Sequence, residues 1–247
     1  MKQFCLTTAM SKRLIGKGLL QHPAIQSVLE RGTLVIIAGT TNGYVAEEIL
    51  RSLGQGAGFS RQGFRRGMVT PPDVQPPALD FPGDVVIRDG QWKQGQTIFD
   101  VAADLQAGDI VLKGGNALDL WGQAAVLVAD PQGGTILAAT AAVVGRRVRL
   151  IVPIGLEKRV LEDVNALALR SNAADAEGPR LFPMPGETFT ELEAIELLIG
   201  AQAYLVAAGG VYGAEGAVWL GIEGNEEQIE AAAQLIQSLA DEPPCRV

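Results

Sequence analysis

The sequence predicts an α/β fold in which a mostly parallel sheet has helices on both faces and a small α+β subdomain follows. Short apolar, β-branched runs alternate with helical patterns over the first two thirds of the chain, as in strands joined by helices. Apolar residues make up 47% of the 247 residues and charged residues 19%, which is typical of a compact globular protein. The rhythm changes after a polar, proline-containing stretch at residues 172–186.

These features divide the chain into three parts. We expect residues 1–171 to form an α/β domain that carries a ligand site, residues 172–186 to be a linker, and residues 187–241 to form the small subdomain. The subdomain pattern is helix, strand, strand, helix, at 189–200, 203–208, 217–222 and 225–240.

The apolar pattern sets the elements of the large domain. A helical lead-in over residues 9–31 is interrupted at His22–Pro23, because a residue that precedes proline is disfavoured in a helix. Strands are expected at 34–38, 109–112, 124–129 and 148–153, and helices at 97–106, 135–145 and 156–168. A tight Asp89–Gly90 turn joins a further strand to a short return strand. The long Gly-, Pro- and Arg-rich loop at 54–82 predicts a lid over a neighbouring site.

Charge and composition exclude several classes of partner. The net charge of -8 argues against nucleic-acid binding, which needs a basic face. No apolar run is long enough to span a membrane and the N-terminus lacks signal-peptide features, so we expect a cytoplasmic protein without a membrane partner. Cys5 and Cys245 lack metal-ligand spacing, and His22 is the single histidine. We therefore expect neither a metal nor a cofactor.

The first candidate binding element follows the strand at 34–38. It is a small, hydroxyl-rich loop that opens into a helix and consists of Gly39, Thr40, Thr41, Asn42 and Gly43. Free backbone N–H groups at a helix start, beside threonine hydroxyls, can hold a phosphate or carboxylate. The alternative interpretation is an ordinary capped turn between a strand and a helix.

The second candidate follows the strand at 109–112 and contains Lys113, Gly114, Gly115 and Asn116. Ligands of open α/β sheets bind at the carboxyl ends of strands, so this loop and the first one are expected to face the same crevice. Lys113 supplies a point charge that suits phosphate, and Asn116 either adds an amide contact or tolerates a left-handed turn. Arg65 and Arg66 belong to a local basic cluster that suits a small anion.

The two loops resemble those of a known superfamily. The residues that carry the resemblance are VIIAGTTNG (35–43) and DVAADLQAGDIVLKGGNAL (100–118). They are similar to the superfamily of ribose-5-phosphate isomerase A, glucosamine-6-phosphate deaminase, coenzyme A transferases and the sensing domains of sugar-responsive repressors. The resemblance implies a Rossmann-like sheet, a small anionic ligand such as a phosphorylated sugar, and a homo-oligomer. The isomerases also carry a small α+β domain late in the chain.

For the isomerase, the resemblance extends to candidate catalytic residues. Asp100 matches the first aspartate of the family pattern, and Lys113 begins its glycine loop. Ala103 replaces the second aspartate, and Asp119 is the carboxylate nearest to the expected glutamate. Isomerisation needs a base for the proton beside a carbonyl and a cation for the enediolate, which are roles for Asp119 and Lys113. The alternative for Asp119 is a helix cap or surface carboxylate.

Three functions compete at this point. The first is an enzyme, specifically an isomerase, that acts on a small phosphorylated sugar. The second is a non-catalytic sensing or binding protein of the same architecture, which the alanine at position 103 favours. The third is coenzyme A transfer, which ranks last because it needs a glutamate nucleophile and no glutamate adjoins either glycine loop in the sequence.

Overall fold

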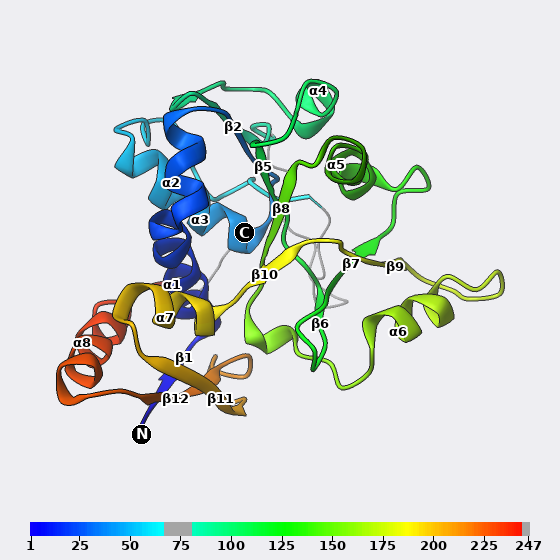
Figure 1. Cartoon of the computed structure of the whole chain (residues 1–247). Coiled ribbons are helices and arrows are strands. Elements are labelled where there is room, and N and C mark those ends of the chain that lie inside the picture. Colours follow the sequence, from blue (N-terminus) through cyan, green and yellow to red (C-terminus); the bar gives the residue numbers. More distant parts are fainter. Residues whose placement is uncertain (67–80, 244–247) are drawn as a thin grey trace.

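The computed structural model describes residues 1–66 and 81–243, and its strands form three sheets (Figure 1). The main sheet contains, in spatial order, β10 (Glu187–Phe189), β8 (Arg149–Pro153), β5 (Ile110–Leu112), β2 (Thr33–Ile36), β3 (Val85–Arg88) and β4 (Gln91–Trp92). The first four are parallel, and β3 and β4 are antiparallel. The chain runs outward from β2 to β4 and then returns to β5, on the other side of β2. The expected α/β architecture is therefore present, with a mixed sheet.

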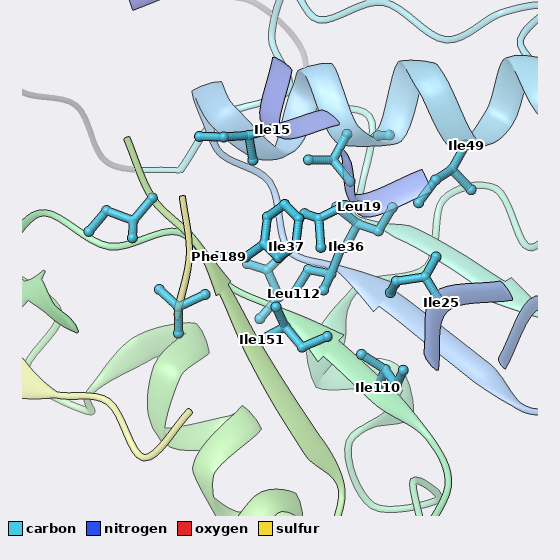
Figure 2. Close-up of a cluster of buried hydrophobic side chains, with 14 of the residues drawn as sticks. Ile15, Leu19, Ile25, Ile36, Ile37, Ile49, Ile110, Leu112, Ile151 and Phe189 are labelled. Atoms are coloured by element: carbon cyan, nitrogen blue, oxygen red, sulfur yellow. The ribbon is translucent and has the colours of Figure 1, made fainter. Parts of the chain in front are cut away.

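Helices cover both sides of the main sheet (Figure 1). On one side lie α1 (Thr8–Gln21), α2 (Pro23–Glu30) and α3 (Thr40–Ser52), and on the other α4 (Ile98–Val101) and α5 (Gly134–Arg146). Figure 2 shows the apolar cluster between the first group and the strands, which includes Ile15, Leu19, Ile25, Ile49, Ile36, Leu112 and Ile151. Each such side chain contributes about 1.5–3 kcal/mol when it is fully buried. This cluster fixes α1 and α3 against the parallel strands.

A buried ionic network also joins α1 to α3. Arg13 of α1 donates to Glu48 at 2.7 Å and to Glu242 at 2.9 Å, and it also pairs with Glu47. The guanidinium groups of Arg13 and Arg61 both lie over the ring of Tyr44, at 4.9 and 3.9 Å from its centroid. The chain after α8 is thereby tied to α1, and through Arg13 to α3.

A second, antiparallel sheet corrects the predicted linker. It contains β6 (Ala117–Leu118), β7 (Ala124–Val128) and β9 (Arg180–Pro183), and α6 (Val164–Ser171) packs against β9. β9 lies within residues 172–186, and the next residue, Met184, is entirely buried and donates its N–H to the carbonyl of Ala124. The linker prediction is wrong because these polar residues pair with a strand far away in the sequence.

The third sheet forms the small subdomain and includes a strand that the sequence did not predict. Its order is β1 (Lys2–Leu6), β12 (Val218–Glu223), β11 (Gln202–Ala208), and all pairs are antiparallel. The helices α7 (Glu191–Ile199) and α8 (Glu226–Gln237) complete the predicted helix-strand-strand-helix pattern. The N-terminal strand thus joins the C-terminal unit, and residues 187–189 of the predicted subdomain belong to the main sheet as β10.

Other predictions are confirmed or corrected locally. His22 ends α1 and caps α2, accepting from the N–H of Ala24, and the Asp89–Gly90 hairpin is present. The predicted helix at 156–168 is instead a short 3-10 helix, η1 (Leu156–Lys158), followed by α6, which Asp163 caps. Residues 67–80 of the predicted lid lie outside the described residues. No helix in the described ranges is long and apolar enough to cross a membrane.

Candidate functional site

The two predicted loops meet at the carboxyl ends of β2 and β5. Ile36 pairs with Leu112, and the N–H of Ile37 donates to the carbonyl of Leu112 at 3.0 Å. The amide of Asn42 then donates to the carbonyls of both Ile37 and Leu112, at 2.7 and 3.0 Å. The side chain of Asn42 therefore links the first loop to Leu112, the residue that precedes Lys113.

The first loop begins α3 without a side-chain cap. Gly39 is the N-cap residue, and the first turn holds no acidic side chain. The hydroxyl oxygen of Thr41 and the amide oxygen of Asn42 are buried and have no hydrogen-bond partner among the described residues. The first N–H groups of a helix also lack intrahelical partners. This helix start thus combines free N–H polarity with unsatisfied side-chain oxygens.

Lys113 enters the same region from β5. Its N–H donates to the carbonyl of Ile151 at 3.1 Å, which fixes the backbone between β5 and β8. Its half-buried ammonium makes only a 3.5 Å contact, to the carbonyl of Gly114, and no ion pair with a described residue. Burial and then the charge of Lys158 lower the pKa of Lys113 to about 8, with Asp84 opposing. The ammonium is therefore mostly charged at neutral pH and under-satisfied.

The glycine loop is tightly packed. A Cβ on Gly115 would lie 2.8 Å from the Ile154 side chain and 3.2 Å from the carbonyl of Ala125, so no larger residue fits there without movement. Gly114 has more space, since the nearest atom to its Cβ position is the Pro153 carbonyl at 3.7 Å. The ammonium of Lys158 donates to the carbonyl of Gly115 at 2.8 Å. Ile154 and Lys158, which follow β8, therefore hold the glycine loop in place.

Arg66 lies at this edge of the main sheet because it pairs with Asp84, which was not among the predicted site residues. Asp84 is buried and accepts from the N–H groups of Ala38 and Ile98, at 2.9 and 2.8 Å. Arg66 lies 3.3 Å from the same carboxylate. Asp84 directly precedes β3. Its position next to the start of a predicted strand is the sequence feature that could have identified it as a site residue. The predicted basic residue is present, with its charge partly neutralised.

A second cluster of charged side chains lies near the ends of β8 and β10. Lys12 of α1 is buried and lies 3.5 Å from Glu157, which adjoins Lys158 in η1. Burial lowers the pKa of Lys158, and Glu157 partly offsets this. Glu191, the first residue of α7, is completely buried and accepts from the N–H of Leu156 at 3.0 and 3.3 Å. None of these residues was predicted, because α1, the segment after β8 and α7 meet only in the folded chain.

Glu191 is the carboxylate with the strongest perturbation in this cluster. Burial and then the neighbouring Glu157 raise the pKa of Glu191 to about 7. With this pKa the carboxyl group is present in both its protonated and its ionised form near neutral pH. The cluster therefore places a carboxyl group with a raised pKa near the ammonium of Lys158.

Asp119 lies elsewhere and has a structural environment. It is buried in the β6–β7 hairpin, where its carboxylate accepts from the N–H groups of Trp121 and Gln123, each at 2.9 Å, and Val164 at 3.3 Å. These bonds satisfy the carboxylate and tie the hairpin to α6. They correct the assignment of Asp119 as a base in favour of the alternative interpretation, a local cap.

Two further predicted residues also make local bonds. The exposed Asp100 forms the capping box of α4 with Thr97, and the side-chain and backbone hydrogen bonds from Thr97 lower its pKa. Asn116 is exposed, and its side-chain oxygen accepts from the N–H of Leu127 at 3.1 Å. Their assigned roles in catalysis and ligand binding therefore lack support from geometry.

The remaining predicted residues flank the site. Thr40 is exposed at the start of α3, Arg65 is half-buried, and Gly43 packs against Arg61, whose Cγ lies 3.3 Å from the Cβ position of the glycine. The described residues contain no group of three or more His, Cys, Asp or Glu side chains that could hold a metal ion. A scan against protein-family models and a search of curated proteins found no match to the chain.

Proposed function

We propose that this protein binds a small anionic metabolite, of the phosphorylated-sugar type, between the start of α3 and Lys113. One observation carries the proposal: an uncapped helix start and an under-satisfied lysine adjoin each other at the carboxyl ends of neighbouring parallel strands. Helix N-termini favour anions, and a lysine supplies the point charge that a phosphate accepts.

The topology supports the same location. From β4 to β10, the strand order 4-3-2-5-8-10 reverses its direction along the chain between β2 and β5. A doubly wound Rossmann sheet, of order 3-2-1-4-5-6, reverses in the corresponding place and binds its ligand there. We infer a Rossmann-like relationship on this ground, with the antiparallel β3 and β4 as a departure from that fold.

The charges around the site suit an anion despite the acidic chain. Lys12, Lys113 and Lys158 approach from α1, β5 and the turn after β8, and Arg66 approaches from the β3 side. Of the carboxylates nearby, Asp84 is neutralised by two N–H groups and Arg66. A bound phosphate would accept hydrogen bonds from donors that otherwise lack strong partners in the described part of the chain, namely the hydroxyl of Thr41 and the ammonium of Lys113.

Catalysis is the second candidate, and Glu191 favours it over pure sensing. Aldose-ketose isomerisation moves a proton between neighbouring carbons, and a carboxylate with a pKa of about 7 suits that transfer. In this version Glu191, which is completely buried and bonded to the N–H of Leu156, would have to become exposed to the ligand to take the place of Asp119 as the proton-transfer group, and Lys113 would steady the developing oxyanion. Ligand binding without turnover would instead assign the chain to sensing.

Thermal shift assays test the binding proposal. Inorganic phosphate and a panel of phosphorylated sugars should raise the melting temperature, because a ligand of the folded state stabilises it. Lys113→Met should abolish the increase, while Lys2→Met, on the exposed strand β1, should leave it unchanged. The absence of protection in the native protein, or equal protection in the Lys113→Met variant, would refute the proposal.

Turnover assays separate the two candidates. A phosphorylated sugar that protects the native protein is incubated with it, and aldose-ketose interconversion is followed directly. If Glu191 moves the proton, Glu191→Gln should lose turnover and keep ligand protection. Interconversion at the native rate in Glu191→Gln would exclude this role for Glu191.

A further inference from the structure

The small sheet has an outer face that is apolar and almost free of charge. Trp219 is 40% exposed while its neighbours Val218 and Leu220 are buried, so β12 has one face in the core and one outside. Opposite strand residues share a face, which places Cys5 beside Trp219 and Tyr204 beside Gly221. Tyr204 is 45% exposed.

Two more apolar side chains lie on this face. A Cβ added to Gly221 would meet the Met1 sulfur at 2.6 Å and a Val206 methyl carbon at 2.8 Å, so both side chains cover the glycine. Met1 is 68% exposed and Val206 is 44% exposed. We call these residues, Met1, Tyr204, Val206 and Trp219, the outer-face cluster.

The charge distribution limits what can cover the cluster. The chain carries a net charge of -8, so the net charges of two copies oppose their approach. On the strands of this face the charged residue is Glu223, at the end of β12 beside Gln202, whereas Lys2 pairs with Ile222 on the inner face. Two copies that approach each other through this face therefore bring few like charges together.

We propose that the outer-face cluster is the contact between two copies of this chain in a symmetric dimer. Each small sheet packs its outer face on the same face of its partner, as in a sandwich of two sheets. Apolar side chains grouped on one face mark such interaction sites, and aromatic residues such as Trp219 and Tyr204 are typical of their centres. The dimer is independent of the proposed ligand site.

Charge insertion tests the contact. The molar mass of the native protein, measured by light scattering over a series of concentrations, should approach twice 26.0 kDa. In a symmetric dimer, Val206→Glu or Tyr204→Glu introduces one negative charge from each copy into the contact. Because these like charges repel, each variant should raise the dimer dissociation constant by about 100-fold or more. Val206 and Tyr204 are both exposed in the single chain, so the substitutions should not disturb its fold. Circular dichroism verifies that the variants fold.

Val144→Glu is the matched control, because Val144 is an exposed valine on α5, away from the small sheet. Its mass should equal that of the native protein. A monomeric native protein, or dimers that persist in both outer-face variants, would overturn the proposal, as would loss of the dimer in Val144→Glu alone.

The exposed Cys5 gives a second readout. In a Cys245→Ser background its alkylation rate should be slow at dimer concentrations and should rise in Val206→Glu. Equal rates in both proteins would contradict burial of this face.

Discussion

Lys113 and Asp119 both follow β5 closely in the sequence, one before and one after the short strand β6, yet their charges have different surroundings. The Asp119 carboxylate accepts three backbone N–H bonds inside the β6–β7 hairpin. The Lys113 ammonium makes a single 3.5 Å contact at the end of β5. A buried charge whose hydrogen bonds are made by neighbouring groups stabilises the fold. A charge with too few hydrogen-bond partners lowers the free energy of unfolding.

The difference indicates which charge is available to a ligand. The bonds of Asp119 would have to break before it could serve as a base, while Lys113 can accept a partner without loss of any strong bond. The four predictions that follow test this contrast between a satisfied and an under-satisfied charge.

The largest effect is expected for Asp119→Ala. Removal of the carboxylate leaves three N–H groups without their acceptor, and should lower the free energy of unfolding by about 4 kcal/mol. Urea denaturation measures this value. Asp104→Ala, at an exposed carboxylate in the same part of the chain, should change it by less than about 0.5 kcal/mol. A variant of normal stability that fails to bind anions would reverse the assignment of Asp119.

Glu191→Gln should remove a pH dependence of stability. The folded pKa of about 7 lies above the ordinary value of 4.5, so the native state binds the proton more strongly and its stability falls as the pH rises from 4.5 to 7. The variant should match the native protein near the lower limit and exceed its stability by about 3 kcal/mol above the upper limit. Urea denaturation at both limits measures the difference, and parallel profiles would contradict it.

Lys113 should control the pH dependence of anion binding. Because its folded pKa is about 8, the ammonium loses its proton above that pH, and phosphate affinity should fall by about tenfold as the pH rises through this value. Lys113→Arg stays charged and should keep binding at high pH. Calorimetric titration at several pH values provides the measurement, and an unchanged native affinity would remove Lys113 from the site.

The smallest effect is expected for Asp100→Ala. Loss of the capping box should lower the melting temperature slightly through α4, and phosphate should protect the variant as well as it protects the native protein. Thr97→Ala, which removes the other half of the box, is the matched variant. A loss of protection in Asp100→Ala alone would return Asp100 to the ligand site.

Much of the fold follows from local patterns. The β-branched runs before Gly39 and Lys113 form strands, and the capping residue His22 divides the first two helices as predicted. The adjacency of the two loops also follows, because parallel neighbours end at the same edge. Strand β1 and strand β9 were missed because their partners, β12 and β7, are distant in the sequence.

The sequence by itself determined that strands precede Gly39 and Lys113, that a helix follows Gly39 and which loops carry glycine and lysine, since these depend on neighbouring residues. Only the tertiary structure decided that Asp119 is satisfied, that Lys113 is not, and that Glu191 is buried beside Glu157. The physical reason is that hydrogen-bond satisfaction and burial depend on groups that strand pairing brings in from distant parts of the chain.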